Sequence, residues 1–304
     1  YPILFDSDSQ ITKANFQNVV SKDTSIIVVP SSQTNSVPLS SLSFTNCQAN
    51  EYIIQIYSSN FEITDSVIQY NQDATNTFGG IKIASVGTIS VINTRFINVK
   101  SDSIISYEHS NKATSDNTLS IESCIFNNCI GSCFYFNTGS ESLDNIHVDG
   151  CTFDGCKKLN VNSITIRAAA TSDSVSLTVE NCKFYNCGQS GSYIVYFEIN
   201  KAANDGGELT FNNNEFKDAS CVGLRILQEG KRLTVHNCSF ENFPSNSNSP
   251  WETTISADRL SNIVIEQCKF TQCGTGGNVI VIQGGVGKAV FQNNDITFAN
   301  SNQC

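Results

Sequence analysis

The segment Cys124-Ile-Phe-Asn-Asn-Cys129 recurs along the chain in close copies, and this repetition is the strongest indication of the fold. Segments of the same C-x-F-x-x-C form begin at Cys151, Cys182 and Cys268. Such repetition is typical of a solenoid, in which each repeat packs only on its neighbours. When the aromatic position is taken as an anchor, successive anchors lie 24 to 32 residues apart. The anchors are Phe16, Phe44, Ile68, Phe96, Phe126, Phe153, Phe184, Phe216, Phe240, Phe270 and Ile296.

The residues before each anchor fall into columns with the periodicity of a strand. Five residues before it, the side chain is apolar in all eleven repeats, and polar residues alternate with apolar ones, as in Leu177-Thr-Val-Glu180. A period of two predicts strands with one buried face. A further strand is predicted in most repeats after a gap of variable length. These strands are Tyr52–Tyr57, Gly80–Ala84, Cys133–Asn137, Ser163–Ala168, Tyr193–Ile199, Val222–Leu227 and Asn278–Gln283.

Two rows of Asn, Asp and Gly mark the bends between the strands. These residue types tolerate a left-handed backbone, and each row therefore predicts a sharp corner. The row two residues after the anchor contains Asn18, Asn46, Asn98, Asn128, Gly155, Asn186, Asp218 and Asn242. The row three residues before it contains Asp65, Asn93, Gly150, Asn181, Asn213, Asn237 and Asn293.

These columns predict an all-β chain: a single right-handed parallel β-helix solenoid of about eleven coils with three strands per coil. No break in the columns indicates a linker, so residues 1–304 are expected to form one domain, with coils from about residue 11 to about residue 300. Stacked coils lie about 4.8 Å apart.

The coil pattern resembles the right-handed β-helix superfamily of pectin-lyase-like proteins. Its F-x-N-C corners and the segment Gly79-Gly80-Ile81 resemble the polymorphic outer-membrane-protein repeats of bacterial and protist surface proteins. The resemblance extends over residues 11 to 300. It implies an extracellular or surface-exposed module and names no ligand.

Composition narrows the classes of partner. The net charge is −10, and without a basic patch no nucleic-acid partner is expected. No apolar run reaches the roughly 18 residues of a membrane span. The chain lacks Met and opens Tyr1-Pro2-Ile3, which fits a mature fragment on the secretory route, and its thirteen Cys favour an oxidising compartment.

Ten of the thirteen cysteines fall in two columns of the repeat, two residues before the anchor and three residues after it. The small or apolar residues elsewhere in these columns favour a ladder of buried thiols. Vertical disulfides between coils are the alternative, although parallel Cβ directions fit disulfide geometry poorly. A zinc site is disfavoured, because no second pair or His stands at tetrahedral spacing.

Four residues before the anchor, three adjacent repeats carry Glu122, Asp149 and Glu180. Carboxylates stacked at the spacing of the coils could share a hard cation such as Ca²⁺, and these three residues are the candidate metal site. The alternative is a solvated acidic stripe without an ion. No other cofactor is predicted.

The motifs expected from a resemblance to polygalacturonases (N-T-D, D-D, H-G and R-x-K) do not occur in the sequence. Arg95, Arg167, Arg225 and Arg259 are candidates for a lyase-like base, but each stands alone in the sequence. The three His have no Ser or Cys partner in a triad arrangement. We therefore expect no enzyme and assign no catalytic residue.

The leading hypothesis is a structural surface protein that forms filaments or assemblies. Because neither end carries an evident cap, homo-oligomers or flanking domains of a longer chain are the expected partners. The first alternative is an adhesin or glycan-binding module with exposed aromatic residues such as Tyr185 or Trp251. The second is a polysaccharide lyase or hydrolase.

Overall fold

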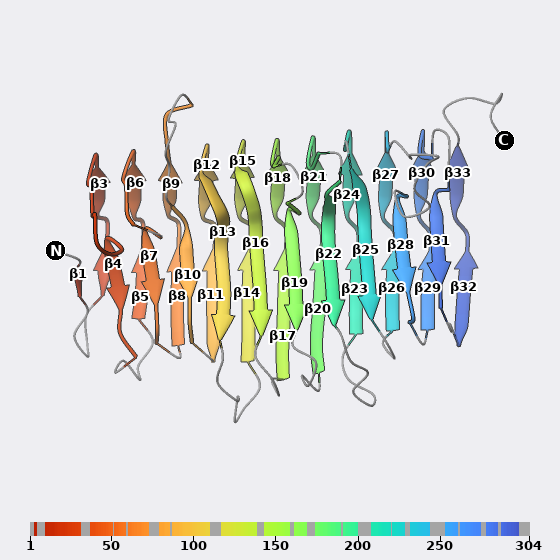
Figure 1. Ribbon diagram of the computed structural model, residues 1–304, viewed down its shortest axis with the longest axis horizontal. Helices are drawn as coiled ribbons and strands as arrows, with labels where there is room; N and C mark the ends of the chain where they lie inside the picture. Colours follow the sequence, from red (N-terminus) through yellow and green to blue (C-terminus); the bar gives the residue numbers. More distant parts are fainter. Residues whose placement is uncertain are drawn as a thin grey trace.

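The structure is a computed structural model of the 304-residue chain. It describes residues 3–4, 10–31, 37–50, 52–58, 60–72, 79–85, 87–109, 117–138, 143–158, 161–168, 174–189, 191–199, 208–219, 221–228, 232–243, 253–260, 262–274, 278–284 and 287–297. These residues form three parallel sheets of eleven strands each, and every third strand along the chain joins the same sheet. Figure 1 shows the three sheets side by side along one rod. The described residues contain no helix, and hence none that could cross a membrane.

Sheet A contains the predicted third strands. Its members are β1 (Ile3–Leu4), β4 (Ile27–Val29), β7 (Ile54–Ile56), β10 (Ile81–Ile83), β13 (Lys100–His109), β16 (Ile130–Thr138), β19 (Ile164–Ala168), β22 (Tyr193–Ile199), β25 (Val222–Gln228), β28 (Ile255–Asp258) and β31 (Ile280–Gln283).

Sheet B contains the strands that precede the anchor. Its members are β2 (Ile11–Thr12), β5 (Val37–Ser40), β8 (Asn60–Thr64), β11 (Thr88–Ile92), β14 (Asn117–Glu122), β17 (Leu143–Asp149), β20 (Ser174–Glu180), β23 (Glu208–Asn212), β26 (Arg232–His236), β29 (Asn262–Glu266) and β32 (Lys288–Gln292).

Sheet C contains the anchors themselves, each at the centre of a three-residue strand. Its members are β3 (Asn15–Gln17), β6 (Ser43–Thr45), β9 (Val67–Gln69), β12 (Arg95–Ile97), β15 (Ile125–Asn127), β18 (Thr152–Asp154), β21 (Lys183–Tyr185), β24 (Glu215–Lys217), β27 (Ser239–Glu241), β30 (Lys269–Thr271) and β33 (Asp295–Thr297). This architecture confirms the predicted fold class and the three strands per coil.

The anchors form a continuous aromatic stack inside the rod. From Phe96 to Phe270, neighbouring rings lie 4.6 to 5.0 Å apart and within 9° of parallel. Ring spacing equals strand spacing because each anchor pairs in register with the next, as Phe126 does with Phe153. Each of these rings is fully buried, so the stack is the apolar spine of the core.

The bends adopt the predicted left-handed backbone. In the row after the anchor, Asn98, Asn128 and Asn186 have φ angles of 52° to 55°, and Gly155 has 66°. Side chains in these corners bond along the axis: the amide of Asn98 donates to the carbonyl of Tyr70 at 3.0 Å. In the row before the anchor, the same conformation also occurs at Lys13, Ser41, Ser123 and Gln267, which the sequence did not mark as bends.

The cysteines are buried thiols, as the favoured hypothesis predicted. All twelve in the described residues are free and buried, and they form no disulfide. Their sulfur atoms belong to a hydrogen-bond ladder: the Cys151 thiol donates to the carbonyl of Ile121 at 3.4 Å, and its sulfur accepts from the Cys124 amide at 3.4 Å. Asn214 fills the same position in its coil, accepting from the Cys182 amide and donating to the Val179 carbonyl.

We predict that Asn186→Val lowers the free energy of unfolding by about 1–3 kcal/mol, because a β-branched residue is strained at positive φ. Asn186→Gly should stay within about 1 kcal/mol of the wild type, since glycine adopts this backbone freely and Gly155 already does so in the next coil. Urea denaturation of the two variants measures the difference. Equal stability of Val and Gly would contradict a left-handed bend at residue 186.

Candidate functional site

The outward face of sheet B carries the acidic residues that the sequence singled out. Glu122, Asp149 and Glu180 are partners in register on β14, β17 and β20. The side chains placed to hold a metal ion together are, however, His147, Asp149 and Glu180. Their ligand atoms all lie within 4.8 Å of one another. Glu122 is not part of this group; its carboxylate accepts a hydrogen bond from Ser120 at 2.5 Å.

Strand geometry brings His147 into the group. His147 and Asp149 are two residues apart on β17 and so face the same side, while Glu180 is the register partner of Asp149. The His147 Nε2 atom lies 2.8 Å from Glu180 Oε1, and the Asn181 amide donates to Asp149 Oδ1 at 2.8 Å. One imidazole and two carboxylates form a donor set that suits Zn²⁺ better than Ca²⁺, which prefers oxygen ligands alone.

The outward face of sheet A carries a second cluster, which the sequence did not indicate. One row of in-register residues combines small and large side chains: Ser106, Tyr135, Thr165, Tyr196, Arg225 and Ser256. Ser106 and Ser256 have no exposed surface although they face outward. The large side chains of the row can cover them, since adjacent strands lie only about 4.8 Å apart.

Tyr196 is the centre of this cluster. The Tyr193 ring stacks against it at a centroid distance of 5.4 Å, and the Arg167 guanidinium lies 5.6 Å from its ring centroid. Arg225 is its register partner on β25, is 8% exposed, and donates a hydrogen bond to the Ser256 hydroxyl. We call Arg167, Tyr193, Tyr196 and Arg225 the tyrosine–arginine cluster.

Burial shapes the electrostatics of the cluster. Desolvation raises the pKa of Tyr196 to about 12, and the hydrogen bond to the Glu198 carboxylate acts in the same direction. Desolvation lowers the pKa of Arg225, against the effects of Tyr193 and Asp258, yet a guanidinium remains charged at neutral pH. The cluster therefore presents an aromatic face and one exposed cation, that of Arg167, which pairs with Glu198 at 3.6 Å, while the Arg225 guanidinium is buried.

The other arginine and histidine candidates lie elsewhere. Of the four arginines expected to stand alone, Arg167 and Arg225 do not: both flank Tyr196 from neighbouring sheet A strands. Arg259 pairs with Asp258 at 3.6 Å. His236 bonds to side chains of adjacent coils.

The aromatic residues proposed for glycan contact lie outside this cluster. Tyr185 is on sheet C, where its hydroxyl donates to Glu215 at 2.6 Å. Trp251 lies outside the described residues, as do most residues of the long loops.

Comparisons with known proteins address the fold. A family model described as "Right handed beta helix region" matches residues 150–240. The A-module of the mannuronan C-5 epimerase AlgE4 from Azotobacter vinelandii aligns over 95% of this chain and 87% of its own, with a TM-score of 0.51. The chain has the right-handed parallel β-helix fold. Sequence identity to the epimerase module is 10%, so the likeness shows the fold alone. No curated protein sequence matches the chain.

Proposed function

We propose that the protein is an extracellular or cell-surface β-helix module that binds a polysaccharide along the outward face of sheet A. The observation that carries this proposal is the tyrosine–arginine cluster, in which stacked rings and the Arg167 guanidinium face outward from neighbouring coils, next to the buried guanidinium of Arg225. Surface placement follows from the resemblance to surface-protein repeats, and it is part of the same proposal.

The chemistry of the cluster suits a sugar chain. Aromatic rings accept the C–H faces of sugars, and arginine binds carboxylates in a fixed fork geometry. Tyr135 stands in the same outward row two strands before Tyr196, about 10 Å away. An extended glycan lying along the axis would thus meet aromatic rings repeatedly.

The structural neighbour supports the ligand class. The AlgE4 A-module belongs by its name to an enzyme that acts on mannuronan, which is a polysaccharide. We favour binding without turnover at Tyr196, because a general base works best with a pKa near the working pH. Burial moves the pKa of Tyr196 away from neutrality, to about 12.

We expect polymannuronate to bind the wild-type chain and Tyr196→Ala to weaken that affinity about tenfold, by loss of the central ring. Isothermal titration calorimetry measures the affinity. Tyr57→Ala is the matched control, since Tyr57 is 39% exposed just beyond β7 of the same sheet and far from the cluster. Unchanged affinity in Tyr196→Ala would refute the site, and NMR detection of altered sugar units would refute binding without turnover.

We also propose that His147, Asp149 and Glu180 bind one divalent cation. The support is the mixed donor set within 4.8 Å on two adjacent strands. Such an ion would offset the repulsion between the stacked carboxylates of this column. The acidic site inferred from the sequence, with Glu122 as third ligand, is the competing arrangement.

Titration calorimetry with Zn²⁺ and with Ca²⁺ separates the two arrangements. We predict tighter binding of Zn²⁺, and at least a tenfold loss in His147→Gln, because the imidazole is the ligand that favours zinc. His236→Gln is the control, as His236 lies on the same sheet and hydrogen-bonds to Asn212. Loss of Ca²⁺ binding in Glu122→Gln, with His147→Gln unaffected, would establish the all-carboxylate site instead.

A second candidate function is assembly with other protein at the ends of the rod. The observation that favours it is the exposure of two core-column residues in the last described coil, Phe291 at 50% and Ile296 at 44%. A further copy of the chain, or a flanking domain, would bury them and pair the strand edges. We expect light scattering to show self-association of residues 1–304 that Phe291→Asp weakens. A stable 33.1 kDa monomer would contradict assembly between copies.

A further inference from the structure

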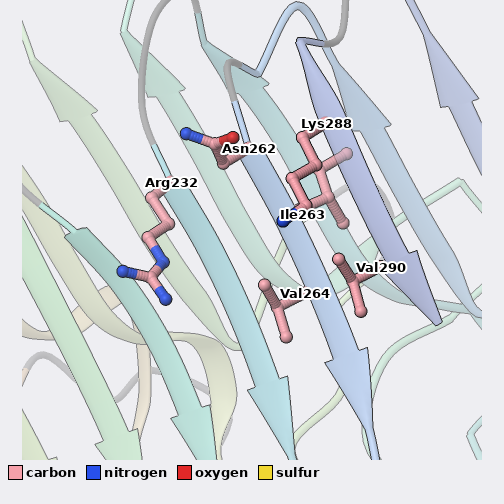
Figure 2. Close-up of a pocket in the computed structure, with 6 residues that line it drawn as sticks. All are labelled: Arg232, Asn262, Ile263, Val264, Lys288 and Val290. Carbon is pink, nitrogen blue, oxygen red and sulfur yellow. The ribbon is translucent and has the colours of Figure 1, made fainter. Parts of the chain in front are cut away.

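A shallow cleft of about 250 Å³ lies on the outward face of sheet B, over β26, β29 and β32. Its polar side is the in-register row Arg232, Asn262 and Lys288, one residue from each strand. Its apolar side is formed by Val264 and Val290, two residues further along their strands. Figure 2 shows these side chains on the three neighbouring strands. We call this site the β26–β32 cleft.

The charge of the cleft is opposite to that of the chain. The chain carries a net charge of −10, and the same face of sheet B holds the acidic column of Glu122, Asp149 and Glu180, of which Glu180 stands two coils before β26. Glu266 lies on β29 itself, two residues past Val264. Arg232 and Lys288 stand on either side of Asn262, with backbones about 10 Å apart. Both side chains are long enough to reach one anionic group above Asn262.

The cations of the cleft are available to a ligand. The nearest acid to Arg232 is Glu208, at 3.6 Å, and both partners are more than half exposed, so this pair contributes little. Among the described residues, the ammonium group of Lys288 and the amide of Asn262 have no hydrogen-bond or ion-pair partner. A ligand anion can therefore gain charge-assisted hydrogen bonds here without breaking strong internal ones.

The polar row and the two valines beside it indicate which class of ligand the cleft can bind. The half-buried Val264 and Val290 form an aliphatic surface next to the polar row. A matching ligand has an apolar face and, along one edge, an anionic group beside neutral hydrogen-bonding groups. A sugar ring that bears a carboxylate or a sulfate has this form: its C–H face covers the valines and its anion meets the cations.

We propose that the β26–β32 cleft is a second glycan site, separate from the tyrosine–arginine cluster, that takes a carboxylated or sulfated sugar of an acidic polysaccharide. The ligand class rests on the proposed function, whereas the cleft and its charge do not. A chain with two sites on different sheets would hold two segments of glycan at once, which raises avidity without new contacts.

The test uses the full chain in the Tyr196→Ala background, so that the cleft is measured alone. The probes are a mannuronate hexamer, a sulfated hexasaccharide and neutral mannohexaose, titrated by calorimetry. We expect at least one anionic probe to bind, and its affinity to fall as the salt concentration is raised. The neutral probe should bind at least tenfold more weakly. The anion that binds more tightly identifies the modification on the sugar.

In that background, Arg232→Gln and Lys288→Gln should each lower the affinity for the anionic probe about tenfold. The control variant Lys269→Gln, on β30 of sheet C, should leave this affinity unchanged. Thermal melts check that every variant is folded. If Tyr196→Ala alone abolishes all binding, the cleft is not a glycan site while the proposed function stands. If Tyr196→Ala changes nothing and Lys288→Gln removes binding, the cleft stands and the sheet A site fails. Binding that is indifferent to Arg232 and Lys288 overturns the inference.

Discussion

Parallel strands stacked in register place each side chain one strand spacing, about 4.8 Å, from its equivalents in the coils above and below. The rest of the structure depends on this constraint. Inside, it turns the anchors into a continuous ring stack, because like residues meet face to face. Outside, it turns single residues into rows, so that Tyr196 and Arg225 become neighbours although they lie a full coil apart in sequence.

The same constraint explains the cysteines. At the bend before many anchors, the inward side chain accepts from an amide and donates to a carbonyl of the preceding coil, as Cys151 does. Cys and Asn both satisfy this requirement in a narrow space, and Ser66 likewise accepts from the Leu42 amide. A thiol has the further advantage that it packs as a small apolar group. The high Cys content thus reflects buried hydrogen bonding rather than cross-linking.

Much of the fold could be predicted because its signals are local and repeated. The anchors, the alternation before them and the Asn corners all have fixed offsets, and the structure confirms them. The bends at Lys13, Ser41, Ser123 and Gln267 could not be predicted, because neighbouring coils impose a backbone that these residues do not favour alone. The tyrosine–arginine cluster could not be predicted for a different reason. The segment between each anchor and the following sheet A strand varies in length, so outward residues of sheet A have no fixed distance in sequence from the anchor. His147 was not predicted as a ligand, since its approach to Glu180 depends on side-chain conformation.

The central claim is the register of the coils, since the ring stack, the thiol ladder and both proposed glycan sites follow from it. Native-state thiol labelling, with each modified cysteine identified by mass spectrometry, tests this register most directly. All twelve described cysteines are buried, so we predict that none of them reacts under native conditions and that all of them react after denaturation. Burial also raises the pKa of Cys133 to about 11 and that of Cys221 to about 12, which slows their reaction further. Rapid native labelling of Cys129, Cys156 or Cys187 would place these side chains in solvent and contradict the account.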